Sequence, residues 1–381
     1  MPSLHILLLD LDDVLIQQVA YHQSLKDCVA MVGRWCGIQA PLTDEDISVF
    51  EALGVTSEWD SSAICAALLL ERAWAADPLR RLPDLPASPD GRPLEASVPD
   101  FQGYFRSAIH PGLTGPEARA ETEKRLSAAR THTELQLEAL RALLRHAYDP
   151  LRSLTARIIQ ELNLGEAGFL AAYGVPSSLR GAGYLATLDP PLISAQTAAR
   201  LVSWASEPGR RAVVFTNRPS LMPRRAGGTP EAEIGLERVG LSSLPFIAMG
   251  HLDWLAAARS LEAQSLTKPS PVHVLAALRR AAGDDLVDSL EAAARLALDQ
   301  AKDGGWGALH GAQVTVFEDS FRGLKSALAA QAALERIGVQ IALDLRGVMT
   351  LPAKAQALEE AGGSVFPDFV GAARGVVDGL A

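Results

Sequence analysis

The chain has 381 residues, of which 48% are hydrophobic and 21% charged, a composition typical of a compact protein of two or three domains. Its 35 Lys and Arg face 45 Asp and Glu without a basic run that could neutralise a row of phosphates, so we expect no nucleic-acid partner. No apolar stretch approaches the roughly 20 residues that cross a bilayer, so we expect no membrane partner and a cytoplasmic location. We also expect a monomer or a homodimer.

The first element is a short apolar run over 4–9 that ends abruptly in Asp10-Leu11-Asp12-Asp13. This pattern predicts a strand buried on both faces, with acids at its carboxyl end. In open α/β sheets, ligands bind at that end of the strands.

Roughly 200 residues, which show mainly helical patterns, separate this run from the next predicted strand. This is far too many residues for a simple crossover connection. We therefore expect a mainly α-helical inserted domain over 17–199, with Thr43 capping its second helix and the Pro-rich segment 77–116 weakly ordered. The predicted helices of this domain are 19–35, 44–53, 61–75, 116–144 and 151–162.

Several side chains of the insertion have simple expectations. The three cysteines, Cys28, Cys36 and Cys65, are predicted to be reduced and buried, because they form neither an even framework nor a metal-ligand pair. We expect core positions for the tryptophans and solvated positions for the arginines. These residues are Trp35, Trp59 and Trp74, and Arg34, Arg72, Arg106 and Arg119.

After the insertion, strands and helices alternate. Predicted strands cover 211–215, 313–317, 339–343 and 363–366, and predicted helices 272–281 and 321–333 fall between them. This alternation indicates an α/β domain with a parallel sheet, built from 1–16 and 200–381. The polar, Gly- and Pro-rich stretch 218–230 is interpreted as a mobile loop near the ligand-binding edge.

Polar residues follow three of the predicted strands. Asp10 and Asp12 are two residues apart, so one carboxylate can attack an electrophile while the other moves a proton. Thr216 ends the second strand and offers a hydroxyl to a phosphate oxygen. Each also has an ordinary interpretation, as an acidic turn or a helix cap.

Two further segments carry candidate functional residues. Lys268 stands in Thr-Lys-Pro-Ser-Pro, where the prolines start a helix and give its ammonium a fixed origin, although a lone lysine is usually solvated. Glu318-Asp319 ends the third strand and supplies hard oxygen ligands suited to Mg²⁺, or a cap for the next helix.

Taken in order, these segments resemble the four motifs of the haloacid dehalogenase-like (HAD) superfamily. They read Asp-Leu-Asp-Asp-Val from residue 10, Val-Val-Phe-Thr-Asn from 213, Lys-Pro-Ser-Pro from 268, and Phe-Glu-Asp-Ser-Phe-Arg-Gly-Leu-Lys-Ser-Ala from 317. The last two look like the branch containing β-phosphoglucomutase and phosphoglycolate phosphatase. The resemblance implies a Rossmann-like core with a helical cap domain between the first and second motifs. Asp13 stands where the family usually has Gly or Thr.

The resemblance implies a Mg²⁺-dependent phosphohydrolase that acts on a small phosphorylated metabolite. Asp10 would form an aspartyl-phosphate, and Asp12 would protonate the leaving alcohol and then deprotonate water. The implied phosphate-binding side chains are Thr216, Asn217 and Lys268. The implied metal ligands are Asp10, the backbone carbonyl of Asp12 and Asp319, with Glu318 as a further candidate.

Other functions share part of this pattern. A phosphomutase would use the same four motifs and differ in how its cap excludes water. A non-catalytic HAD-fold binding protein would use the enlarged insertion as a partner surface. A dehalogenase would need neither Asp12 nor the Glu318-Asp319 pair. The sequence leaves the substrate open among sugar phosphates, nucleotides and small organic phosphates.

Overall fold

The computed structural model describes residues 4–80, 96–110, 113–128, 132–225, 227–302 and 304–379. The chain divides into two compact units, Met1–Gln18 with Asp189–Ala381, and Val19–Leu188. We call the first the sheet unit and the second the helical unit, and each is described by itself. The sequence predicts that the inserted domain covers 17–199. In the structure, residues 17–18 and the segment from Asp189 to 199 belong to the sheet unit instead.

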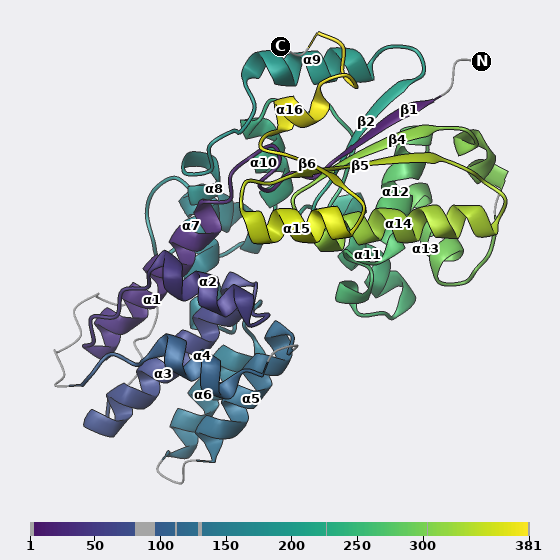
Figure 1. Ribbon diagram of the computed structural model, residues 1–381. Coiled ribbons are helices and arrows are strands. Elements are labelled where there is room, and N and C mark those ends of the chain that lie inside the picture. The colour runs from purple at the N-terminus through teal and green to yellow at the C-terminus, as the bar shows by residue number, and fades with distance from the viewer. Residues whose placement is uncertain are drawn as a thin grey trace. The chain divides into compact units, whose positions relative to one another are not determined.

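The sheet unit contains a six-stranded parallel sheet in the order β3-β2-β1-β4-β5-β6 (Figure 1). In register, Leu9 of β1 is opposite Val214 of β2 and Phe317 of β4, so the carboxyl ends of these three strands lie next to one another. The predicted α/β class with a parallel sheet is confirmed. The strands are β1 (His5–Leu9), β2 (Arg210–Phe215), β3 (Phe246–Ile247), β4 (Gln313–Glu318), β5 (Ala342–Val348) and β6 (Ser364–Phe366).

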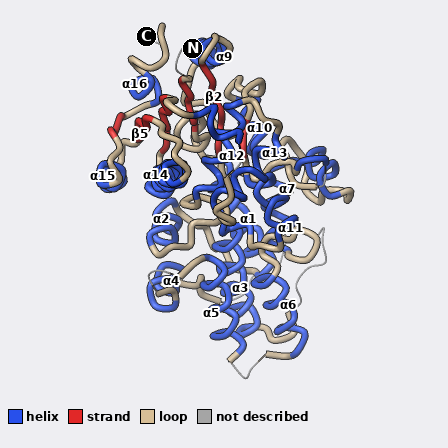
Figure 2. The backbone as a smooth tube through the Cα atoms, turned by 90° about the vertical axis from the view of Figure 1, so that its right-hand side faces the viewer, coloured by secondary structure: helices blue, strands red, loops and turns tan. Residues whose placement is uncertain are grey.

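Helices cover both faces of the sheet, as the turned view in Figure 2 also shows. Alternate residues of β1 point to opposite faces, so Ile6 and Leu8 join one apolar cluster while Leu7 and Leu9 join the other. This two-sided burial explains why β1, β2 and β4 are nearly continuous apolar runs. The first cluster includes α11 (Met249–Arg259), α12 (Pro271–Ala282), α13 (Leu286–Ala297), α14 (Phe321–Arg336) and α15 (Pro352–Glu360), and the second includes α9 (Ala195–Ala205), α10 (Glu231–Arg238) and α16 (Phe369–Ala373).

Two strands depart from the sequence prediction. The strand predicted over 339–343 is wrong in position, because β5 runs from Ala342 to Val348 and Asp344 lies inside it, opposite Thr315. Asp344 is tolerated there because 45% of its side chain is exposed to solvent, and its carboxylate also accepts a hydrogen bond from Arg346 at 2.8 Å on the same strand. Strand β3 was not predicted, since its two residues are too few to show a period.

The helical unit is an α-helical insertion, as predicted, with Thr43 and Asp46 forming a capping box at α2. The single helix predicted over 116–144 is wrong, because α5 ends at Ser127 and α6 begins at Glu134 after its own cap, Thr133. The described helices of the helical unit are α1 (Ala20–Cys36), α2 (Asp44–Ala52), α3 (Glu58–Ala76), α4 (Phe101–Ala108), α5 (Gly115–Ser127), α6 (Glu134–Arg145), α7 (Leu154–Tyr173) and α8 (Tyr184–Thr187).

The Pro-rich segment 77–116 was expected to be weakly ordered. Residues 81–95 and 111–112 of this segment lie outside the described residues. The expectation is wrong for the part that forms α4, where the Asp100 side chain accepts a hydrogen bond from Gly103 N and caps the helix.

The interior of the helical unit buries the three cysteines and the tryptophans Trp35, Trp59 and Trp74, as predicted. Arg119 corrects a prediction of solvation: its side chain is mostly buried, and its Nε lies 2.5 Å from a carboxylate oxygen of buried Asp60. The hydroxyl of Tyr148 donates to the other Asp60 oxygen at 2.9 Å. A buried carboxylate is therefore compensated inside this unit.

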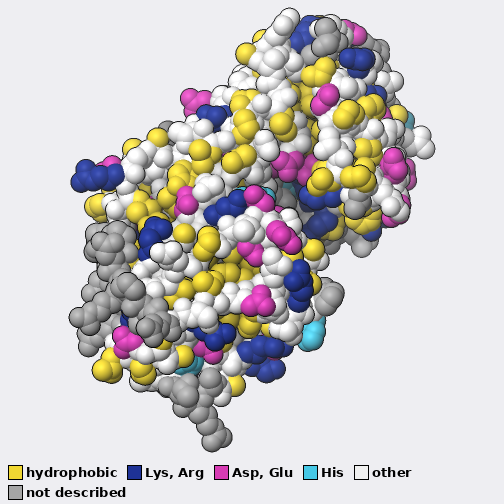
Figure 3. All heavy atoms as spheres, turned by 60° about the vertical axis from the view of Figure 1, so that its left-hand side comes forward, with side chains coloured by type: hydrophobic (Ala, Val, Ile, Leu, Met, Phe, Trp, Pro, Cys, Tyr) yellow, Lys and Arg dark blue, Asp and Glu magenta, His cyan; other side chains and the backbone are white. Residues whose placement is uncertain are grey.

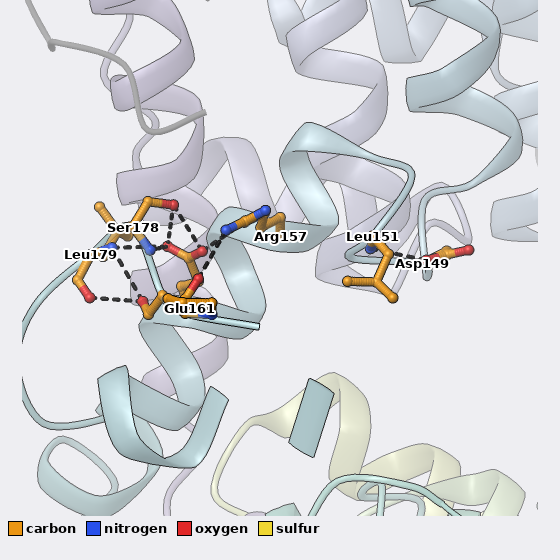
Figure 4. A network of polar contacts seen from close by, with 8 residues as sticks. Asp149, Leu151, Arg157, Glu161, Ser178 and Leu179 are labelled. Atoms are coloured by element: carbon orange, nitrogen blue, oxygen red, sulfur yellow. Dashed lines mark hydrogen bonds and ion pairs between the residues drawn. The ribbon is translucent and has the colours of Figure 1, made fainter. Parts of the chain in front are cut away.

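A second buried carboxylate, Glu161 of α7, anchors the loop that follows this helix (Figure 4). It accepts hydrogen bonds from the backbone N of Ser178 and of Leu179, both at 2.9 Å, and from Arg157 Nε at 2.7 Å. With its oxygens engaged in this way, Glu161 has a structural role.

The exposed surface carries charges of both signs. Basic and acidic side chains are both scattered over the face seen in Figure 3. Among the described residues, none of the helices combines the length and apolar character that would let it span a bilayer.

Candidate active site

The site begins at the end of β1, where the apolar run gives way to Asp10. The backbone N of Asp10 donates to the carbonyl of Phe317 at 2.9 Å, which continues the pairing with β4 and holds Asp10 at the sheet edge. Its side chain is buried, and its Oδ1 accepts a hydrogen bond from Lys268 Nζ at 2.7 Å. Asp10 and Lys268, 258 residues apart in sequence, are therefore in direct contact.

Lys268 lies in the loop that leads into α12, and its side chain is buried. Its ammonium also donates to Glu318 Oε1 and lies 4.1 Å from the ring centroid of Phe215. Burial alone would lower the pKa of Lys268, but the carboxylates of Asp10 and Glu318 raise it above its usual value. The ammonium is therefore charged at neutral pH.

Glu318, the last residue of β4, is completely buried. While Oε1 accepts from Lys268, Oε2 accepts from the backbone N and the hydroxyl of Ser320, at 2.9 and 2.7 Å. A Cβ on Gly323 would lie 1.9 Å from this carboxyl group, so only glycine fits at that position of α14. Both Glu318 oxygens are thus occupied in holding Lys268 and the start of α14.

Asp319 completes an acidic cluster with Asp10 and Glu318, whose ligand atoms all lie within 4.8 Å of one another. Burial and the neighbouring Glu318 charge raise the pKa of both Asp10 and Asp319 well above the usual value, and Lys268 only partly opposes this. Among the residues that the structure describes, one cation, Lys268, therefore faces three carboxylates. Such a site suits a divalent cation with oxygen ligands, and Asp10 and Asp319 are the better ligands because Glu318 already accepts bonds at both oxygens.

The other acid of the first motif, Asp12, contacts an arginine that the sequence prediction missed. Arg218 Nε and Nη2 lie 2.8 and 2.6 Å from Asp12 Oδ1, and Nη2 also lies 2.8 Å from Asp189 Oδ2. Arg218 and Asp189 are buried, so the expectation of a mobile loop is wrong at its first residue. The available signal was the position of Arg218, three residues past the last residue of the predicted strand, Phe215.

Asp13 directly follows Asp12 and has a φ of 54°. This left-handed backbone favours glycine, and aspartate is one of the few other residues that adopt it readily. The Asp13 charge also contributes to the raised pKa of Asp319, which adds to the need for a cation.

Thr216 and Asn217 lie at the same sheet edge but differ in exposure. Thr216 is buried, and its Oγ1 accepts a hydrogen bond from Arg218 N at 3.1 Å, which leaves its hydroxyl hydrogen available as a donor. Asn217 is exposed. Within the described residues, neither side chain hydrogen-bonds to Asp10, Lys268, Glu318 or Asp319, so their phosphate-binding roles stay predictions.

His273 of α12 packs against Phe215, whose ring also contacts Lys268. Its Nε2 lies 3.1 Å from the carbonyl O of Ile247, and its ring packs edge-on against Phe215 at 5.6 Å between centroids. Burial, and secondarily the Lys268 charge, lowers the pKa of His273 to about 3. The ring is thus neutral at physiological pH, and Nε2 carries the hydrogen because a carbonyl can only accept.

Comparisons with known proteins identify the fold. No protein-family model matches the chain, and no curated protein matches it in sequence. A Northeast Structural Genomics Consortium target, ZR25, solved by X-ray crystallography, matches with a TM-score of 0.64 and 17% identity over 99% of both chains. Phosphatase Tt82 from Thermococcus thioreducens gives a TM-score of 0.46 and 13% identity over 93% of this chain and 99% of that one. At 17% identity, the likeness to the first structure establishes a shared fold.

Proposed function

We propose that this chain is a Mg²⁺-dependent phosphohydrolase that cleaves a small phosphomonoester through an aspartyl-phosphate on Asp10. One observation carries the proposal: the Asp10 carboxylate lies at the ligand-binding edge of a parallel sheet, 2.7 Å from the Lys268 ammonium and in one cluster with Asp319. These residues come from three of the four segments that resemble HAD motifs. Their proximity favours a shared chemical task.

The first step is nucleophilic attack on phosphorus. Lys268 holds Oδ1 of Asp10, so Oδ2 is the oxygen that forms the new bond to phosphorus while the bond from phosphorus to the ester oxygen breaks. Asp12 gives its proton to the departing alkoxide. The Lys268 ammonium offers fixed positive charge to the equatorial oxygens, on which the transition state spreads its negative charge.

The second step releases phosphate and restores both acids. Asp12 takes a proton from a water molecule, the water oxygen bonds to phosphorus, and the bond from phosphorus to Asp10 breaks. Asp10 returns to a carboxylate, and Asp12 regains the proton it needs for the next cycle. One ester and one water are thus converted to one alcohol and one phosphate.

The acidic cluster fits a divalent cation, because within the described part of the chain Lys268 is the one cation that neighbours its three carboxylates. Asp10, Asp319 and the backbone carbonyl of Asp12 would hold Mg²⁺, with Glu318 behind them. When bound, the ion would neutralise charge on the phosphoryl oxygens.

The direct test is a panel of phosphomonoesters assayed for inorganic phosphate with Mg²⁺ and with EDTA. Wild type is expected to release phosphate only with the metal, and Asp10→Asn is expected to be inactive on every ester. Asp253→Asn is the matched control, since Asp253 is also partly buried in the sheet unit but lies on α11 outside the cluster. Activity in Asp10→Asn would remove the covalent mechanism, and phosphoryl transfer to a second hydroxyl without phosphate release would identify a mutase.

A second test separates the roles of the two aspartates. p-Nitrophenol leaves without being protonated, so Asp12→Ala is expected to form phosphoenzyme from p-nitrophenyl phosphate and then stall because water lacks its base. The result would be a stoichiometric burst of p-nitrophenol followed by slow turnover. Steady release without a burst would leave Asp12 without an acid–base role.

A further inference from the structure

The Arg218 guanidinium lies between two carboxylates and is itself almost fully buried, with 1% of its side chain exposed. Its Nε and Nη2 both contact the same oxygen of Asp12, Oδ1, and its Nη2 also contacts Asp189. A planar guanidinium that directs two N–H groups at one carboxylate oxygen fixes the position of that oxygen. Arg218 therefore restricts how the Asp12 side chain can rotate.

The main chain around Arg218 is also fixed. Its N donates to Thr216 Oγ1 at 3.1 Å, and its carbonyl accepts from Met249 N at 3.0 Å. A Cβ on Gly235 of α10 would lie 3.2 Å from Arg218 Nη1 and 2.9 Å from a methyl group of Leu11. The absence of a side chain at Gly235 thus makes room for the guanidinium against the loop that carries Asp12.

Asp189 is a rigid anchor rather than a solvated partner. It is fully buried, and its backbone carbonyl accepts a hydrogen bond from Arg238 Nε at 2.8 Å. The residues that follow it pair with the loop after β1: Gln17 N donates to Pro190 O at 3.0 Å, and Leu192 N donates to Leu15 O at 2.9 Å. Asp189 and Asp12 are therefore held in one network through Arg218.

The contacts distinguish the two oxygens of Asp12. Both Arg218 donors reach Oδ1, whereas no described residue hydrogen-bonds to Oδ2, and 23% of the Asp12 side chain is exposed. General acid catalysis needs the proton-carrying oxygen to be within reach of the leaving group. An Asp12 whose Oδ1 is held on the protein side has Oδ2 left for that purpose.

We propose that Arg218, anchored by Asp189, is a positioning residue that holds Asp12 by Oδ1 so that Oδ2 exchanges the proton with the leaving group and with water. The proposal rests on the proposed phosphohydrolase function. In the first step the bond from Oδ2 to its hydrogen breaks and the proton moves to the departing alkoxide. In the second step Oδ2 takes a proton from water.

The test compares an ester that needs the acid with one that does not. Phosphoenzyme formation is measured by rapid quench in a single turnover, with glycerol phosphate and with p-nitrophenyl phosphate. Arg218→Met is expected to slow this step at least about tenfold more for the alkyl ester than for the aryl ester. Arg218→Lys should recover part of the loss, because an ammonium can restore one contact, and Asp189→Asn should show a smaller loss in the same direction.

A double-mutant cycle excludes a merely structural role. If Arg218 acts only through Asp12, then adding Arg218→Met to Asp12→Ala slows phosphoenzyme formation from glycerol phosphate, the ester that needs the acid, by no more than about twofold further. Losses that multiply in the double variant would overturn the proposal, as would equal losses for the two esters in Arg218→Lys. The lysine and Asp189→Asn variants keep this comparison available if Arg218→Met fails to fold.

Arg279→Lys is the matched control. Arg279 is also buried, and its Nε donates to Asp284 at 2.6 Å at the far end of α12. Its replacement is expected to lower stability without changing the ratio of alkyl to aryl rates. Wild type without activity on any ester would instead remove the proposed function, and an active wild type with an unchanged ratio in the Arg218 and Asp189 variants would refute the positioning role alone.

Discussion

Lys268→Met tests whether a single ammonium holds the acidic cluster together. The substitution keeps an unbranched side chain but removes the cation that contacts Asp10 and Glu318. The side chains of the three residues are 5%, 8% and 0% exposed. Removing one partner from a buried ion pair costs about 3–5 kcal/mol, because the remaining charge is left without compensation.

The chain contains a matched control for distance. Lys26 Nζ lies 2.6 Å from Asp44, against 2.7 Å between Lys268 and Asp10. The control pair is solvated, with 22% of the Lys26 side chain and 84% of the Asp44 side chain exposed. Water already screens such a pair, so Lys26→Met is expected to cost about 0–1 kcal/mol.

Hydrogen exchange followed by mass spectrometry measures both costs locally, which avoids assuming that two units unfold together. In EDTA, peptides covering β1 and β4 should exchange about 10² to 10⁴ times faster in Lys268→Met than in wild type. Lys26→Met should change the exchange of α1 and α2 peptides by no more than about fivefold.

Mg²⁺ provides the second measurement. Without its ammonium, the cluster is expected to be stabilised more by Mg²⁺ than in wild type, because the ion then becomes the main compensation for three carboxylates. If β1 and β4 in Lys268→Met exchange within about fivefold of wild type in EDTA, the ion pair does not support the cluster and the reasoning is refuted.

Three further substitutions test other contacts of the site. Asp319→Asn should lose the rise in melting temperature that Mg²⁺ gives wild type, a stabilisation of about 1.4 kcal/mol at ten times the Kd; an equal rise in both would place the metal elsewhere. The pKa of His273 is about 3 in the folded state and 6.5 in the unfolded chain. The unfolded chain therefore binds more protons than the folded one as the pH falls below 6.5, and this group should lower the free energy of unfolding of wild type by about 2 kcal/mol between pH 7 and 5. The destabilisation caused by His273→Gln should shrink by that amount in urea unfolding over the same range, and a constant difference would contradict a neutral, buried ring. Gly323→Ala should displace the Glu318 carboxyl group and cost about 1–3 kcal/mol by thermal unfolding, whereas Gly304→Ala, which would contact no atom within 4 Å, should lack this steric cost; equal effects would contradict the close approach at Gly323.

The sequence by itself determined the α/β class and the positions of β1, β2 and β4. These strands are short apolar runs because both faces of a parallel sheet are buried, and that signal is local. The same property placed Asp10, Thr216 and Glu318-Asp319 at strand ends, which share one edge in any parallel arrangement. Where the local signal was mixed, prediction failed: the charged pair Asp344 and Arg346 concealed the true extent of β5.

Only the tertiary structure decided which of these side chains contact one another. The contacts of Lys268 with Asp10 and Glu318 span 258 and 50 residues, and they depend on strand order and on where α12 begins. The sequence analysis missed Arg218 because its partners, Asp12 and Asp189, lie 206 and 29 residues away in the sequence. A local pattern cannot specify such pairs, because their proximity results from the packing of elements that are distant in sequence. For the same reason the sequence indicated acids at the sheet edge, while the number of cations available to compensate them became known only from the folded chain.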